Sequence, residues 1–194
     1  MLVPVHLARA EGVFNELVDP GIDVGLGTGL DFRLGPAQPD GNCIRCHTVF
    51  VSLARWTRKS PPNYVARAHY LLGRTVDSGR VWDLAATARY VRARHDAQTP
   101  VFLAGEGAGA IWSIYAALLE PDVAGIALSQ FPATHMDNSA APLLNVLRVC
   151  DVPEALGLLA PRPVTVVGPA ANCEETAAAL YRSAGAPEKF TVQK

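Results

Sequence analysis

A glycine-rich turn is the stretch of this chain best suited to chemistry. Residues 101–104 predict a buried strand, Gly105-Glu106-Gly107-Ala108-Gly109 follows them, and residues 110–119 predict an apolar helix. Strand, tight turn and helix form the layout in which the motif G-x-S-x-G presents a nucleophilic serine. Here Gly107 stands at the serine position. Glycine adopts the required positive φ readily, so we expect the turn without its nucleophile. An ordinary glycine-rich strand-to-helix turn is the alternative.

A second group of reactive residues lies in the N-terminal part of the chain. Cys43, Cys46 and His47 form a C-x-x-C-H sequence, in which two thioether bonds attach haem c and the histidine becomes an axial ligand. Nothing in the sequence marks a second axial ligand, and a zinc site would need two more ligands. Three interpretations stay open: thiols without a cofactor, haem c and another metal. We expect no cofactor.

Acidic and basic side chains could supply chemistry of another kind. His135 and Asp137 lie in a loop that follows a predicted strand over residues 123–130, and Glu106 lies in the glycine-rich turn. Ligands bind at the carboxyl ends of parallel strands, so these residues are candidates for acid–base work. The alternative is that His135 and Asp137 are solvated loop residues.

Other polar side chains are expected to be structural. His95 ends a predicted helix, where a cation interacts favourably with the helix dipole. Cys173 has no basic neighbour in the sequence that would lower its pKa and make it a nucleophile. Ser113 and Ser129 are expected to pack in the interior or to lie on a helix surface.

Composition limits the classes of partner. The chain has 194 residues, of which 49% are hydrophobic and 18% charged, and its net charge is −1. Such a surface has little to attract nucleic acid, and no apolar run reaches the roughly 18 residues of a membrane span. The first residues lack the pattern of a signal peptide. We expect a cytoplasmic location if no leader was removed, and a periplasmic or extracellular one if haem c is attached.

Strands and helices alternate through the second half of the chain. Residues 164–168 and 189–193 predict two further strands, in addition to 101–104 and 123–130. Helices are predicted over these ranges: 64–72, 81–95 (capped by Asp77 or Ser78), 110–119, 141–147, a segment starting at Asp151, and 174–184. Residues 1–63 are poorly patterned, with strand candidates at 3–8 and 13–18. The pattern over 64–194 indicates an α/β protein with a mostly parallel sheet and helices on both faces, a three-layer α/β/α sandwich.

Two sequence segments give this half of the chain a resemblance to a known family. Residues 71–83 (LLGRTVDSGRVWD) precede the glycine-rich turn, and residues 159–163 (LAPRP) precede the strand at 164–168. In this order they resemble the C-terminal half of α/β-hydrolases, in particular the acetyl xylan esterase and dipeptidyl-peptidase-like branch. The resemblance covers about residues 64–193. It implies an α/β-hydrolase-like fold that is reduced at its N-terminal side.

The resemblance also implies where a Ser/His/Asp triad would lie. Gly107 occupies the nucleophile position, and the N–H of Ala108 would form half of an oxyanion hole. The acid would follow residues 164–168, where Glu174 or Glu175 could substitute for an aspartate, and no histidine follows the last predicted strand. The resemblance therefore implies a hydrolase-like protein that acts as a binding or structural subunit.

The partners and the alternatives follow from that interpretation. A homo- or hetero-oligomer could complete the sheet, and a small ester or peptide could be the ligand. One alternative is an esterase or peptidase with a non-standard site on Glu106, His135 and Asp137. The other is an electron-transfer subunit that carries haem c on Cys43, Cys46 and His47.

Overall fold

The computed structural model describes residues 64–94, 100–168 and 173–193. The strands expected at 3–8 and 13–18 lie outside these residues, as do Cys43, Cys46, His47 and His95. Among the described helices, none is long and apolar enough to cross a membrane.

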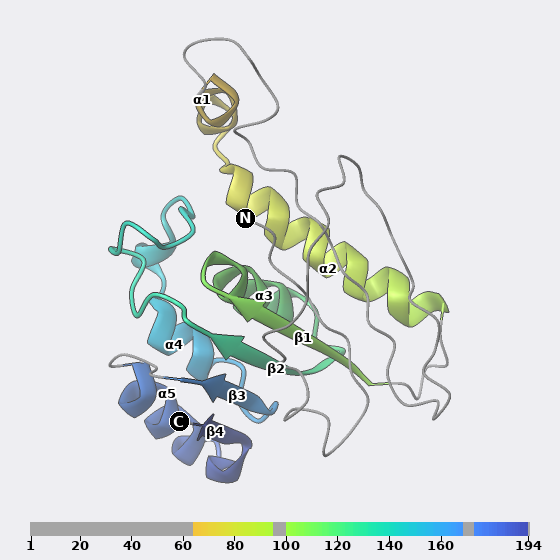
Figure 1. The fold of residues 1–194 in the computed structure, drawn as a ribbon, viewed down its shortest axis with the longest axis vertical. Helices are drawn as coiled ribbons and strands as arrows, with labels where there is room; N and C mark the ends of the chain where they lie inside the picture. The colour runs from red at the N-terminus through yellow and green to blue at the C-terminus, as the bar shows by residue number, and fades with distance from the viewer. Residues whose placement is uncertain (1–63, 95–99, 169–172, 194) are drawn as a thin grey trace.

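The described residues form an α/β fold around one parallel sheet (Figure 1). Four strands lie in the order β1-β2-β3-β4, and every neighbouring pair is parallel. This confirms the predicted alternation of strands and helices. The elements are α1 (Tyr64–Leu71), α2 (Val76–Arg94), β1 (Val101–Glu106), α3 (Ala108–Leu119), β2 (Val123–Ser129), η3 (Val146–Arg148), α4 (Val152–Gly157), β3 (Val164–Val167), α5 (Cys173–Ser183), η4 (Pro187–Lys189) and β4 (Phe190–Gln193).

The strand order determines where the connecting helices lie. Each strand is added beside the one before it, and crossovers between parallel strands are right-handed, so α3, α4 and α5 share one face of the sheet. The contacts agree, because α3 packs on β1 and β2, and α4 packs beside α5. Helix α2 packs against α3. The described residues thus form the sheet and one helical layer.

The two faces of the sheet differ in chemistry. Side chains alternate between the faces, and paired residues of parallel strands share a face. The helix side carries large apolar residues that are almost fully buried, namely Leu103, Ile126, Leu128, Val164 and Val166. The opposite face carries Phe102 and Val167 together with smaller or polar residues, among them Ala104, Ala127, Ser129 and Thr165, and Thr165 Oγ1 lies 3.1 Å from Thr191 Oγ1. The main core therefore lies between the sheet and α3, α4 and α5.

Helix α2 begins five residues before the expected start. Thr75 and Ser78 exchange hydrogen bonds at its N-terminus: Ser78 N donates to Thr75 Oγ1 (2.9 Å), and Thr75 N donates to Ser78 Oγ (3.1 Å). This reciprocal pair satisfies two N–H groups, as a capping box does. The cap is therefore Thr75, and the prediction of Asp77 or Ser78 was wrong. The predicted apolar face is confirmed, because its members are buried: Val81, Leu84, Ala85, Ala88 and Val91.

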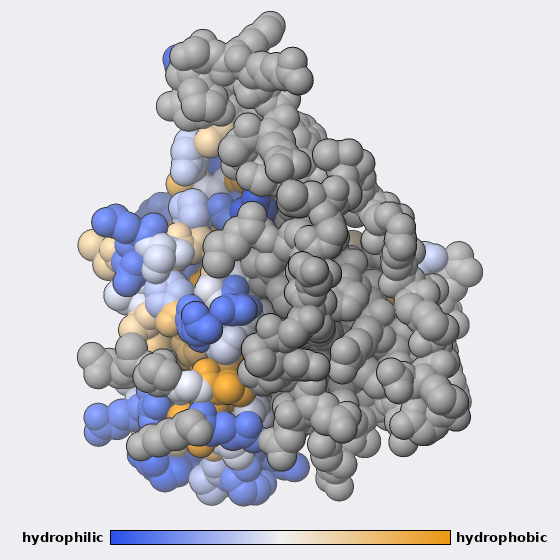
Figure 2. Space-filling model, viewed as in Figure 1, coloured by the Kyte–Doolittle hydropathy of each residue, from blue (hydrophilic) through white to orange (hydrophobic). Residues whose placement is uncertain are grey.

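The helix expected over residues 141–147 does not form. The segment contains only the short 3₁₀ helix η3. Asn145 precedes it with φ 61° and ψ 8°, a left-handed conformation that an α-helix does not contain. Residues 141–147 therefore belong to the loop that connects β2 to α4. Figure 2 shows hydrophilic side chains over this loop and over α5, with a small apolar area near β3.

Candidate functional site

The glycine-rich turn joins β1 to α3 at the carboxyl end of the sheet. Gly107 is the N-cap of α3, with φ 57° and ψ −124°. Its N–H donates to Ser129 O at the end of β2 (3.1 Å), and its carbonyl accepts from Ala110 N (3.2 Å). The positive φ expected at this position is therefore present. Because β1 and β2 end side by side here, the turn lies where parallel sheets bind ligands.

Gly105 is required by the close approach of β1 to α3. A Cβ at this position would lie 2.4 Å from Gly109 O and 2.7 Å from Ala110 N, which are both backbone atoms. Backbone atoms of two packed elements cannot move aside as a side chain can. The first glycine of the motif therefore lets the helix start directly against the strand.

Gly107, by contrast, has space around it among the described residues. A Cβ there would have one atom of those residues within 4 Å, Gln130 O at 3.9 Å. A serine side chain would fit there. The positive φ would strain its backbone, at a cost of about 1–3 kcal/mol. Gln130 itself has φ 48°, a rare conformation for a residue other than glycine. The turn thus has the shape of a nucleophile elbow, and what it lacks is the side chain.

The remaining residues of the turn also lie at the carboxyl ends of the strands. Glu106 is the last residue of β1, is partly exposed and aligns with Ser129 of β2. Ala108 is the first residue of α3, so its N–H belongs to the N-terminal turn, where N–H groups have no partner within the helix. Ser113 lies further along α3 and donates to Gly109 O (2.9 Å). It is a buried packing hydroxyl, as expected.

His135 is hydrogen-bonded to neither Glu106 nor Asp137, its expected partners. Its Nε2 lies 2.8 Å from the hydroxyl of Tyr115, a residue of α3 whose backbone lies about 12 Å along the helix from Gly107. Asp137 is exposed, and its carboxylate accepts from Ser139 N (2.8 Å) and Ser139 Oγ (2.7 Å). These hydrogen bonds hold the pKa of Asp137 below its ordinary value. The structure therefore pairs His135 with Tyr115, and Asp137 with Ser139.

Asp151 has a role beyond the helix cap expected from the sequence. It caps α4 in a capping box with Glu154. It also holds the loop after β2, because its carboxylate accepts from His135 N (2.7 Å) and from Thr134 Oγ1. Burial would raise the pKa of Asp151, but these hydrogen bonds and that from Val152 N outweigh burial and keep the pKa below its ordinary value. Sequence spacing alone does not reveal that one carboxylate joins α4 to this loop.

We expect the fold to lose stability as the pH falls below 7, in part through His135. Burial lowers the pKa of His135 below its ordinary 6.5, although Asp151 and the backbone of Ala141 oppose this. A lowered folded-state pKa gives stability that is complete above 6.5 and is lost as the pH falls towards the folded value, since the unfolded chain binds the proton more readily. Chemical denaturation at several pH values should show a decline between pH 7 and 5 that is shallower in His135→Gln. An equal decline in both proteins would contradict this role.

Cys173 is inert as a nucleophile. It is buried, and its thiol donates to Ala133 O (3.3 Å). Burial, with nearby carboxylates, raises its pKa to about 11, so the thiolate is rare at neutral pH. Glu174 and Glu175 follow it in the first turn of α5. Residues 169–172, which precede this turn, lie outside the described residues, so a role of either glutamate as the acid stays a prediction.

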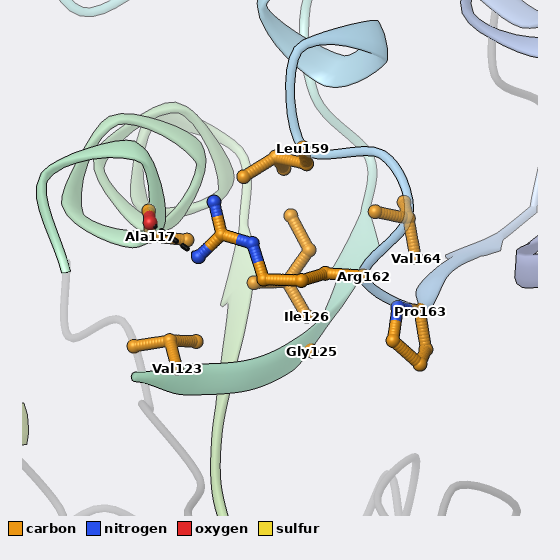
Figure 3. A pocket seen from close by; sticks show the side chains of 8 residues that line it. All are labelled: Ala117, Val123, Gly125, Ile126, Leu159, Arg162, Pro163 and Val164. Carbon is orange, nitrogen blue, oxygen red and sulfur yellow. Dashed lines mark hydrogen bonds between the residues drawn. The ribbon is translucent and has the colours of Figure 1, made fainter. Parts of the chain in front are cut away.

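The LAPRP segment (residues 159–163) has a structural role at the amino-terminal ends of the strands. Arg162 Nη1 donates to Ala117 O (2.6 Å) and Glu120 O (3.1 Å) at the C-terminal end of α3 (Figure 3). A cation there also suits the helix dipole. The residues around it line a shallow recess of about 130 Å³, open solvent included, beside the first residues of β2 and β3. This recess lies at the opposite strand ends from Gly107.

The earlier phrase, residues 71–83, fastens α2 to α3. Trp112 Nε1 of α3 donates to Asp77 Oδ1 of α2 (3.0 Å). Arg80 binds the same oxygen (2.9 Å), and its guanidinium carbon lies 4.6 Å from the centroid of a Trp112 ring. Both segments, residues 71–83 and 159–163, thus contact the helix that begins after Gly107.

Comparison of the chain with family models, curated proteins and solved structures found no match. Within the described residues, no three His, Cys, Asp or Glu side chains group closely enough to hold a metal ion. The haem c hypothesis concerns Cys43, Cys46 and His47, which lie outside the described residues, and stays a prediction that an absorption spectrum tests.

Proposed function

We propose that this protein is an α/β-hydrolase-like protein that lacks Ser/His/Asp chemistry and acts as a binding or structural subunit. The observation that carries the proposal is the conformation of Gly107, with φ 57° and ψ −124°, between β1 and the helix packed on it. This is the backbone that presents an elbow nucleophile, on a residue without a side chain.

The surroundings of the elbow support the same conclusion. A nucleophilic hydroxyl needs a base within hydrogen-bonding reach and a third group that orients the base. His135 Nε2 is occupied by the hydroxyl of Tyr115, and Asp137 binds Ser139 instead of orienting His135. In the proposed three-layer sandwich, further chain or a partner covers the face of the sheet opposite α3, α4 and α5.

The experiment is ester turnover by four purified proteins. Initial rates with p-nitrophenyl acetate would be measured for the wild type, Gly107→Ala, Gly107→Ser and His135→Ala, each checked by circular dichroism. We expect all four to match a denatured sample. Turnover that survives Gly107→Ala but is lost in His135→Ala would favour an esterase with a non-standard site and would contradict the proposal.

The variant Gly107→Ser is the most informative of the four. We expect it to fold, because its Cβ clashes with none of the described residues and the positive φ is the cost that opposes it. It should gain no turnover, because His135 is hydrogen-bonded to Tyr115 through Nε2 and no carboxylate orients its Nδ1 among the described residues. Hydrolysis in this variant at least a hundredfold above the wild type would show that a base stands ready near the elbow.

A further inference from the structure

Helix α2 has an exposed face opposite the one that packs on α3. The helix lies at one end of the helical layer (Figure 1), and its buried side holds the apolar residues described above. On the other side, Trp82 is 59% exposed and Tyr90 is 46% exposed. Residues three, four and seven apart share a helix face, so one stripe contains both aromatic side chains. The six residues of this stripe are all exposed: Trp82, Asp83, Ala86, Arg89, Tyr90 and Ala93.

The stripe is symmetric about Ala86. Trp82 and Tyr90 lie four residues before and after it, and Asp83 and Arg89 lie three residues before and after it. Residues seven apart lie almost in line along a helix. Trp82 and Arg89 therefore form one flank of the stripe, and Asp83 and Tyr90 form the other.

We propose that two copies of this chain associate through α2, with the two helices antiparallel and the two-fold axis at Ala86. In such an interface each flank meets the same flank of the second copy in reverse order. Trp82 then lies against Arg89 of the second copy, and Asp83 lies beside Tyr90 of the second copy. The axis repeats both contacts. At the centre, the small Ala86 side chains let the two backbones approach closely.

The pairing of Trp82 with Arg89 is electrostatically favourable. A guanidinium is attracted to the face of a tryptophan ring, and this chain already contains such a pair, with the guanidinium carbon of Arg80 4.6 Å from the centroid of a Trp112 ring. Arg89 is suited to this role, because Glu120 Oε1 holds its Nε at 2.9 Å while 54% of the Arg89 side chain stays exposed. The second copy therefore meets a guanidinium whose position is already fixed, which lowers the entropy cost of association.

The charges of the stripe favour a second copy over a strongly charged partner. Asp83 is acidic, Arg89 is basic, and the carboxylate of Glu120 offsets the charge of Arg89. The stripe therefore has no cluster of cations that would attract nucleic acid or an acidic peptide. In the antiparallel pair, each charged side chain of the stripe lies against an aromatic residue, and like charges do not oppose each other.

A single pair of helices makes a weak dimer. The 19 residues of α2 span about 28 Å. One helix face of that length is smaller than the roughly 800 Å² that each partner buries in a standard interface. We therefore expect a dissociation constant of about 10–100 µM. The stripe contains no atom of the glycine-rich turn, so this dimer goes beyond the proposed function and does not depend on it.

The test is sedimentation equilibrium of the full chain between about 1 and 500 µM, a range that brackets the expected constant. The average mass should rise from 20.6 kDa towards twice that value. Ala86→Glu places two carboxylates at the axis and should weaken association at least about tenfold. It should fold, because the position is exposed and glutamate favours helices. Thr176→Glu adds the same charge at an exposed position of α5 and should associate as the wild type does.

A mixture of two variants tests the position of the axis. Ala86→Lys should also associate weakly by itself. Its equimolar mixture with Ala86→Glu should form a heterodimer at least as tight as the wild-type dimer, since opposite charges then meet at the axis. Three results would overturn the proposal: a wild type that stays monomeric at the highest concentration, an Ala86→Glu variant that associates as the wild type does, and a mixture that associates no more tightly than either variant alone.

Discussion

Replacing Gly105 with alanine is expected to lower the free energy of unfolding by about 3 kcal/mol, the upper part of the range for overpacked interiors. The new methyl group would lie 2.4 Å from Gly109 O and 2.7 Å from Ala110 N. Relief requires α3 to move away from β1, and α3 is held on its other sides by α2 and β2. Chemical denaturation monitored by circular dichroism measures the loss.

Gly107→Ala is the matched control, since it adds the same methyl group two residues away in the same turn. Among the described residues it meets Gln130 O alone, at 3.9 Å, so its cost is the strain of φ 57°, about 1–2 kcal/mol. A larger loss for Gly107→Ala than for Gly105→Ala would mean that conformational strain, and not the contact between strand and helix, determines which glycines this turn needs.

Replacing Arg162 with methionine is expected to cost about 2–3 kcal/mol of stability. The variant keeps an apolar stem but removes the donor that binds Ala117 O and Glu120 O. Ala117 O would lose its partner, because the residue four positions further on is Pro121, which has no N–H, whereas Glu120 O still accepts from Val123 N (3.1 Å). A buried acceptor left unpaired costs about 1–3 kcal/mol. The lost interaction of the cation with the helix end adds to this. Denaturation midpoints of the purified variant measure the effect.

Two further substitutions separate the causes of that loss. Arg162→Lys keeps the positive charge but loses the planar fork, so we expect about half the effect. Arg182→Met removes an exposed arginine from the last turn of α5 and should change stability by no more than about 0.5 kcal/mol. If Arg162→Met is as mild as Arg182→Met, water satisfies the α3 carbonyls and LAPRP does not stabilise that helix.

Local patterns predicted the parallel α/β fold well. The apolar runs at 101–104, 123–130 and 164–168 are buried strands, because the helix side of this sheet requires continuous large apolar residues. The helix expected at 141–147 failed because spacing of apolar residues cannot show that Asn145 adopts a left-handed conformation. The start of α2 was missed because Thr75 and Ser78 cap through a reciprocal pair that lies upstream of the first apolar residues.

The candidate site was predictable only in part. The turn at Gly105–Gly109 follows from sequence, since positive φ and close backbone approach both demand glycine there. Which side chains meet His135 does not follow, because Tyr115 and Asp151 are 20 and 16 residues away along the chain and come together only through the packing of α3 and α4.

Labelling with a fluorophosphonate probe tests the central claim most directly. Such probes form a stable adduct with an activated serine and leave ordinary hydroxyls unmodified. Intact mass spectrometry of the native chain after prolonged exposure should show the unmodified 20.6 kDa protein, in line with an elbow that has glycine where the nucleophile would stand. A stoichiometric adduct that maps to one serine of the folded chain, and that vanishes on unfolding, would contradict the account.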